Sequence, residues 1–233
     1  MSTNTQEIKW KLHNYKNKKI LIWGLKNGLI IPYDDRLIEK LRSIYYGGIP
    51  ASIILLSDGL CNGHCYDRAV LLSRAFFDEE DDIKLLYARI NSLKLNPELA
   101  GKDDMHYDHC IVERITKNGE HLIYDTSAGL IYDKRLYWLS EHPKIRKIND
   151  KESIIKFVRE DEEYEPEDIE RDKYAAPFIL PMIEATYGRP NEMYSTLGIE
   201  LLQREIELFK QDIQYDDICR EIDEDMKRLG LRK

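Results

Sequence analysis

Two β-branched runs joined by a tight turn constrain this fold more than any other feature of the sequence. The runs extend from His109 to Thr116 and from Glu120 to Ser127, and Lys117-Asn118-Gly119 separates them. An Asn-Gly pair between two such runs is a strong signal for a β-hairpin. A third strand is expected from Ile83, in the segment IKLLYARINSL. Strands grouped in this way, rather than alternating with helices, predict an α+β fold with an antiparallel sheet.

The hairpin also brings two reactive side chains together. His109 opens the first predicted strand and Asp125 closes the second. Because the start of one hairpin strand lies beside the end of the other, we expect these side chains to be cross-strand neighbours. A carboxylate beside an imidazole fixes the orientation and tautomer of the ring, which suits His109 to act as a general base.

A cysteine at the start of an apolar helix is the second chemical feature. The segment from Gly59 to Phe77, GLCNGHCYDRAVLLSRAFF, changes at Cys65 from turn-forming residues to an apolar-periodic run. This pattern predicts a loop and then a helix driven into the core. A thiol in the first turn lies near unpaired backbone N–H groups and the positive end of the helix dipole, so we expect Cys65 to be acidic and nucleophilic. The Cys65 backbone N–H and the Asn62 side chain are candidate oxyanion donors, and His64 is a neighbouring candidate for tuning the thiol.

Other interpretations of the cysteines stay open at this point. Cys61 is an alternative nucleophile, although the helix is predicted to start after it. Cys61, His64 and Cys65 also suggest zinc, but structural zinc sites prefer paired C-x-x-C units, which are absent, so we expect no metal and no cofactor. Cys110 is expected to face the side of its strand opposite to His109 and to be buried, because neighbouring strand residues alternate.

Charge and length exclude several classes of protein. The chain has 233 residues and a net charge of −8, which argues against a nucleic-acid partner because such binding needs a basic surface. No apolar run approaches the roughly 20 residues of a membrane span, and the N-terminus has no signal-peptide pattern. The four cysteines have irregular spacing, unlike a disulfide scaffold. We therefore expect a cytoplasmic protein with reduced thiols and no membrane association.

Three motifs, in this order, resemble the transglutaminase-like superfamily. Gly63 to Leu72 is similar to its G-x-C-x-x-x-A-x-L-L motif, His109 to Glu113 to its H-x-x-V-E strand, and Asp125-Thr126-Ser127 to its D-P-T strand end. Cys110 stands where an aromatic residue usually follows the histidine, and Thr126 replaces the proline. The motifs lie between Gly59 and about Gly129, less than a third of the chain.

The resemblance implies a papain-like fold and a catalytic triad. In that triad Cys65 is the nucleophile, His109 the general base and acid, and Asp125 the orienting carboxylate. The implied activity is attack on a peptide or protein amide to form a thioester, which water or an amine resolves. Peptidase, deamidase and transglutaminase activities all fit. A non-catalytic binding or scaffold protein that keeps the fold is the alternative from a different class. A peptide N-glycanase is a third, although that class usually has a zinc-binding C-x-x-C pair.

Weaker signals organise the remainder of the chain. A second Asn-Gly pair, Asn27-Gly28, lies between two apolar runs, Ile20 to Gly24 and Leu29 to Tyr33, and predicts another hairpin. Asp34 and Asp35 are expected to cap a helix that reaches Tyr45, and Lys134 to Leu139 to continue the sheet.

The expected domain organisation divides the chain near residue 150. Residues 1–150 are expected to form the catalytic domain. Residues 151–233 are expected to hold a short helix from Ile154 to Val158, an acidic segment, Arg159 to Asp172, and a helical extension over Ser195 to Leu229. That extension is expected to pack on the main domain, with homodimerisation through its helices as the alternative.

Overall fold

The computed structural model describes residues 16–46, 49–51, 55, 65–91, 106–126, 129–161, 204 and 215–231. Residues 16–26 are helical. The strands are β1 (Ile30–Pro32), β2 (Tyr45–Tyr46), β3 (Ile49–Pro50), β4 (Asp82–Asn91), β5 (His106–Ile115), β6 (His121–Asp125), β7 (Leu130–Asp133) and β8 (Lys144–Asp150). The helices are α2 (Asp35–Arg42), α4 (Cys65–Ser73) continued by the 3₁₀ turn Arg74–Phe76, α5 (Lys134–Glu141), α6 (Lys151–Asp161) and α9 (Tyr215–Arg228).

A six-stranded antiparallel sheet forms the centre of the described structure. Its strand order is β1-β7-β6-β5-β4-β8, and β2 and β3 pair separately. The predicted hairpin is present: β5 and β6 pair antiparallel, and Gly119 in the turn has a φ of 78°. The predicted strand after Ile83 is β4, and the helix that follows Cys65 is α4. The α+β fold class expected from the sequence is therefore confirmed.

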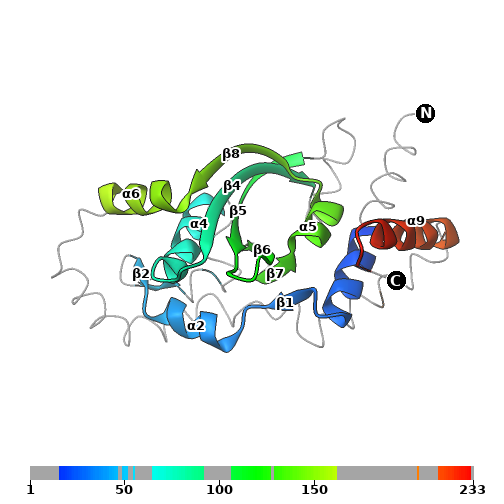
Figure 1. Ribbon diagram of the computed structural model, residues 1–233, viewed down its shortest axis with the longest axis horizontal. Helices are drawn as coiled ribbons and strands as arrows, with labels where there is room; N and C mark the ends of the chain where they lie inside the picture. The colour runs from blue at the N-terminus through cyan, green and yellow to red at the C-terminus, as the bar shows by residue number, and fades with distance from the viewer. Residues whose placement is uncertain are drawn as a thin grey trace.

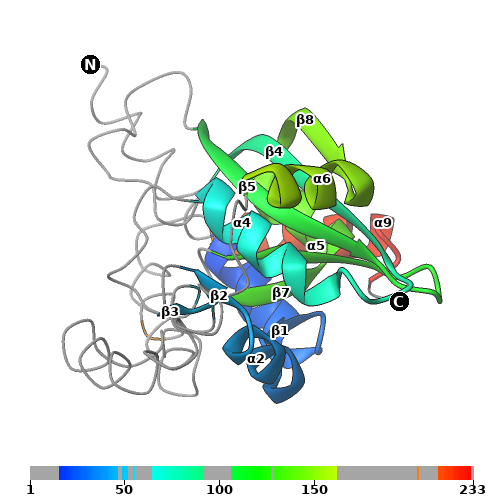
Figure 2. The same cartoon turned by 90° about the vertical axis from the view of Figure 1, so that its left-hand side faces the viewer.

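Helices lie on both faces of the sheet (Figures 1 and 2), and each face carries an apolar core. Side chains alternate along β4 and β5, so Leu85 and Val112 face one cluster while Leu86 and Ile111 face the other. Helices α2, α4 and α6 cover the first face, which also buries Cys110 as expected. The second face is covered by α5, α9 and the helix of residues 16–26. Figure 2 views the sheet from the side of α4 and α6, with α5 and α9 behind it.

The expected hairpin around Asn27-Gly28 is wrong. The run Ile20 to Gly24 lies inside the helix of residues 16–26, and β1 pairs with β7 instead. Gly28 has a φ of 67°, and the backbone N–H of Leu29 donates to the carbonyl of Gly24. This is a glycine-terminated helix end, which needs the same positive φ as a tight hairpin turn. The Asn-Gly pair is therefore compatible with a hairpin turn and with a helix end. The helix is favoured because it buries the apolar residues of this segment in the core shared with α5 and α9.

Gly24 lies where this helix closely approaches β1 and α5. A Cβ atom there would lie 2.5 Å from Ile30 Cδ1 and 2.6 Å from Leu136 Cδ2. Both neighbours are fully buried, so neither can move aside easily. We expect Gly24→Ala to lower the free energy of unfolding by about 1–3 kcal/mol, although alanine favours helix. Urea unfolding measures this, and Gly24→Ala combined with Ile30→Val should recover part of the loss. An unchanged stability of Gly24→Ala would contradict this packing.

Two further expectations need correction. Lys134 to Leu139 does not continue the sheet: Asp133 accepts a hydrogen bond from the backbone N–H of Arg135 and starts α5. The apolar content of this segment fits a strand, but the buried residues Leu136 and Leu139 lie three apart, as on one face of a helix. Helix α2 begins with the expected N-cap, Asp34, but ends at Arg42.

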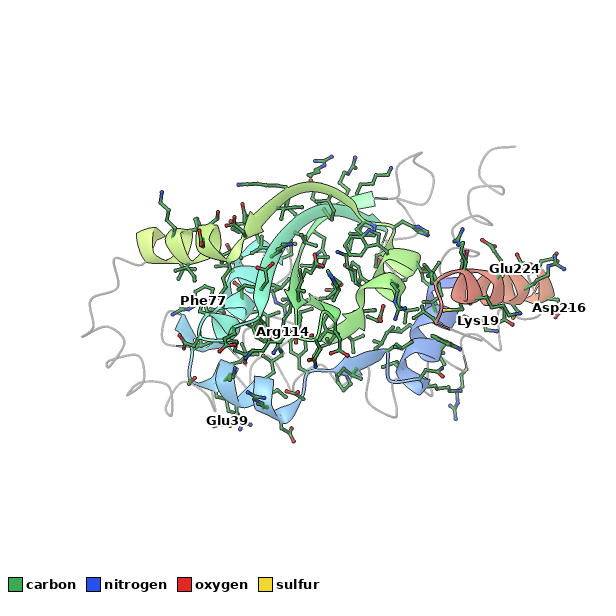
Figure 3. All side chains as sticks on the ribbon, in the orientation of Figure 1. Lys19, Glu39, Phe77, Arg114, Asp216 and Glu224 are labelled. Atoms are coloured by element: carbon green, nitrogen blue, oxygen red, sulfur yellow. The ribbon has the colours of Figure 1, made fainter. Side chains whose placement is uncertain are left out.

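The C-terminal helix α9 packs against the helix of residues 16–26, in the core on the second face of the sheet. Ile218, Ile222 and Met226 of α9 are buried in the core that contains the helix of residues 16–26. Lys19 of that helix donates to Cys219 Sγ at 3.0 Å, and Figure 3 labels Lys19 beside α9. This part of the predicted extension therefore shares a core with the N-terminal helix of the described residues. Residues 162–203 and 205–214, with most of the acidic segment, lie outside the described residues.

Candidate functional site

His109 and Asp125 are in contact, as the hairpin predicts. Strands β5 and β6 pair from Val112↔Tyr124 to Ile115↔His121. Continuing that register by one residue places Asp125 opposite Ile111, so His109 lies diagonally across from Asp125 on the same face. His109 Nε2 lies 3.1 Å from Asp125 Oδ1, and both side chains are buried. One expectation needs correction: β5 begins at His106, so His109 is the fourth residue of its strand.

Cys65 is the first residue of α4, and its thiol faces His109. Burial alone would raise the pKa of Cys65, but hydrogen bonding and attraction to the His109 imidazole outweigh burial and lower it. The backbone N–H groups of Cys110 and Tyr66 also donate to the sulfur and lower its pKa further. One donor belongs to the helix N-terminus and the other to strand β5. The thiolate therefore has three hydrogen-bond donors, drawn from two elements.

His109 is held in its protonated form. Burial disfavours the imidazolium, but the Asp125 carboxylate and the Cys65 sulfur outweigh that effect and raise the pKa of His109 to about 10. A lowered thiol pKa and a raised imidazole pKa together indicate a thiolate–imidazolium ion pair. Because Nε2 faces Asp125, Nδ1 is the ring nitrogen that remains for the thiol.

Helix α5 supplies a residue that the sequence analysis missed. The hydroxyl of Tyr137 donates to Asp125 Oδ2 at 3.3 Å, and Tyr137 is fully buried. His109 and Tyr137 thus use different oxygens of one carboxylate. Tyr137 lies in the segment predicted to be a strand. Its sequence position therefore gave no indication that its side chain would contact Asp125.

Glu141, one turn further along α5, places a second carboxyl group near the site. Burial, and then the negative charge of Asp125, raise the pKa of Glu141 well above its usual value; His109 and a hydrogen bond with Ser140 lower it less. Its Oε2 atom is buried and has no hydrogen-bond partner in the described structure. The protonated form of Glu141 is therefore favoured over that of an exposed glutamate, which lessens the second negative charge near Asp125.

Replacing Glu141 by glutamine should stabilise the protein in a pH-dependent way. The raised pKa means that the folded state binds the proton more tightly than the unfolded chain, so stability falls as pH rises above the ordinary glutamate pKa of about 4.3. Because glutamine cannot ionise, the variant should not lose stability in this way as the pH rises. We expect Glu141→Gln to match the wild type near about pH 4 and to exceed it by about 1–2 kcal/mol near about pH 8.

Urea unfolding at both pH values measures this effect. Glu152→Gln, at an exposed carboxyl on α6, serves as the control and should show no such pH-dependent difference. A Glu141→Gln variant that is less stable at both pH values would show that the carboxyl group is ionised and partnered.

The remaining candidates are placed as follows. Cys110 is fully buried, and burial raises the pKa of its thiol far above the ordinary value. Cys61, Asn62 and His64 lie outside the described residues. Among residues that the structure does describe, no group of three or more His, Cys, Asp or Glu side chains could hold a metal ion.

Comparison with protein-family models, with curated proteins and with solved structures finds no match for this chain. In the described part of the chain, no helix combines the length and the apolar composition that a membrane span requires. What the structure defines is a mixed α+β fold with a Cys–His–Asp constellation, in which His109 and Asp125 are buried and Cys65 is half-buried.

Proposed function

We propose that this chain is a cysteine-dependent enzyme that cleaves amide bonds through a thioester, with a papain-like arrangement of the transglutaminase-like type. The observation that carries the proposal is the position of His109 between two partners. Its ring contacts Asp125 at 3.1 Å on one side and hydrogen-bonds to the Cys65 thiol on the other. A scaffold protein has no use for a lowered thiol pKa beside a raised imidazole pKa.

Each residue has a defined part in the proposed reaction. The Cys65 thiolate attacks the carbonyl carbon of an amide, forming a C–S bond, and the negative charge moves to the oxygen. His109 gives its proton to the leaving nitrogen, the C–N bond breaks, and a thioester remains. His109 then takes a proton from water or from an amine, which attacks the thioester and releases the acyl group from sulfur. Asp125 keeps the ring oriented throughout.

Acyl transfer from p-nitrophenyl acetate tests this function without a known substrate. We expect a burst of nitrophenolate equivalent to one acetyl group per chain, and mass spectrometry should locate the acetyl group on Cys65. Turnover should then follow, and Cys65→Ala should abolish both phases. Cys219→Ser, which alters a thiol beside α9, should leave both unchanged.

Adding a dansylated amine separates the two outcomes of the same mechanism. If the amine accelerates deacylation and appears as its acetyl derivative, the chain is an acyltransferase; if it has no effect, the chain is a hydrolase. An absence of acetylation at Cys65 would overturn the proposal and leave a scaffold that keeps the fold.

A further inference from the structure

A β-bulge in the edge strand β8 redirects a basic side chain toward the candidate site. The register with β4 changes from Tyr87↔Lys147 to Ala88↔Ile145, so Arg146 is the extra residue. A bulge of this kind turns a side chain out of its regular alternation. Arg146 reaches Asp108 Oδ1 at 3.4 Å, although β4 lies between β8 and the strand of Asp108.

Arg146 crosses the sheet on the face where the Cys65 helix packs. Tyr87 is paired with Cys110, which faces α4, and Arg89 is paired with Asp108 two residues further along the same face. Arg89 Nε lies 3.8 Å from the same Asp108 oxygen. Two guanidinium groups therefore share one carboxylate.

Tyr87 places this cluster beside the nucleophile. Burial raises the pKa of Tyr87, and the Asp108 charge, a hydrogen bond to Asp108 and the Cys65 thiolate raise it further, while Arg146 lowers it. Tyr87 also lies opposite Cys110, whose backbone N–H donates to the Cys65 sulfur, so the phenol lies close to the nucleophile. Arg89 follows Tyr87 by two residues on the same face of β4.

Among the residues that the structure describes around this point, basic groups outnumber carboxylates. The basic side chains are those of Arg89, Lys144, Arg146 and Lys147, and the carboxylates are those of Asp67 and Asp108. Lys147 also lines a hollow of about 220 Å³ with Tyr66, the residue after Cys65, and with Phe157. The whole chain has a net charge of −8, so this surface, here called the basic rim, opposes the overall charge.

We propose that the basic rim selects acyl donors with a carboxylate close to the reacting amide, as in a peptide with an acidic residue at that position. Guanidinium groups bind carboxylates through charge-assisted, often bidentate hydrogen bonds, and Asp108 holds two of them side by side. Lys144 and Lys147 extend the positive potential along β8 for the flanking peptide. This inference rests on the proposed function of Cys65 and adds a substrate class to it.

The ratio of two alkylation rates at Cys65 measures the potential that the rim creates. Iodoacetate is an anion and iodoacetamide is its neutral counterpart, so intrinsic thiol reactivity largely cancels in the ratio. We expect Arg89→Ala combined with Arg146→Ala to lower the iodoacetate-to-iodoacetamide ratio about three- to tenfold at low ionic strength. Arg146→Lys keeps the charge and should keep the ratio close to that of the wild type.

A matched control removes the same charge elsewhere. Lys84→Ala combined with Lys117→Ala takes away one half-buried and one exposed cation, which pair with Asp82 and Glu80, and should leave the ratio unchanged. A ratio that is the same in the wild type, the arginine variant and the lysine control would overturn the basic rim. An equal fall in both double variants would also overturn it, because the effect would then be one of net charge.

Peptide probes test the substrate class itself. Two acetylated tripeptide chloromethyl ketones, with glutamate or glutamine next to the reactive carbon, should label Cys65 at different rates. We expect the glutamate probe to react faster with the wild type and this preference to disappear in the arginine variant. An equal rate for both probes would overturn the acidic-peptide assignment. A failure of the proposed function would appear separately, as an ordinary thiol pKa in the iodoacetamide profile.

Discussion

Cys65 should react with iodoacetamide at a substantial rate near about pH 6, and His109→Ala should lower that rate about ten- to hundredfold. An unperturbed thiol with a pKa of about 8.5 is only about 0.3% thiolate at that pH. In this protein His109 is the main cause of the lowered pKa of Cys65, through a hydrogen bond and its charge. The backbone N–H groups of Cys110 and Tyr66 remain in the variant, so part of the effect should persist.

The pH profile has a second expected feature. The wild-type thiol should keep its imidazolium partner until the pH approaches about 10, where His109 loses its proton. Alkylation should therefore rise to a plateau well below the pH of an ordinary thiol, and a second change should occur near the pKa of His109. Rates at Cys65 are measured by peptide mass spectrometry, since Cys219 is also partly exposed.

Two variants keep this experiment decisive. His109→Gln approximates the volume of the buried ring, so a loss of reactivity there is not a packing defect. Cys61→Ser should retain the wild-type profile, which distinguishes Cys65 from the other cysteine of the motif. If Cys65 titrates like an ordinary thiol in the wild type, the ion pair does not exist. That result would favour the non-catalytic scaffold protein over the enzyme.

Asp125→Asn should reduce turnover by about 10²–10⁴-fold while leaving Cys65 in place. Attraction to the Asp125 carboxylate is the largest cause that raises the pKa of His109, so an amide there lets that pKa fall. The amide also offers a donor as well as an acceptor to Nε2, which permits the wrong ring tautomer. The measurement is deacylation after the p-nitrophenyl acetate burst, together with NMR of the His109 ring nitrogens against pH.

Tyr137→Phe is the matched control for Asp125→Asn. It removes only the hydroxyl that donates to Asp125 Oδ2 and leaves the His109 contact on Oδ1. We expect turnover to fall less than about tenfold and the pKa of His109 to remain high, since one neutral hydrogen bond contributes about 0.5–1.5 kcal/mol. Equal effects of Tyr137→Phe and Asp125→Asn would contradict an orienting role for the carboxylate charge.

The two Asn-Gly pairs show what local sequence can and cannot predict about this fold. Around Asn118-Gly119 the flanking runs pair as β5 and β6, and the hairpin is present. Around Asn27-Gly28 the preceding run is helical, and the positive φ of Gly28 ends that helix. Glycine geometry is common to both outcomes, so the Asn-Gly pair does not separate them. The difference lies in where the flanking apolar residues are buried, which is a long-range property.

The candidate site shows the same difference between what local sequence predicts and what depends on long-range packing. His109 and Asp125 were predicted as neighbours because a hairpin joins them within a short segment. The start of α4 at Cys65 was predictable from the change there from turn-forming residues to an apolar-periodic run. Tyr137 and Glu141 were missed because α5 reaches the site through the packing of a helix on the far face of the sheet. No local pattern encodes that contact.

The backbone N–H of Cys110, in strand β5, donates a hydrogen bond to the Cys65 sulfur. The sulfur therefore interacts with the backbone of the sheet as well as with His109. Strand β6 pairs with β5 only as far as Val112, and the thiolate accepts a main-chain donor just beyond that point. The chemical state of the sulfur is therefore transmitted to the backbone. Alkylation or oxidation that ends its role as an acceptor leaves a buried amide without that partner, and the amide-exchange rate of Cys110 becomes an intrinsic reporter of whether the nucleophile is intact.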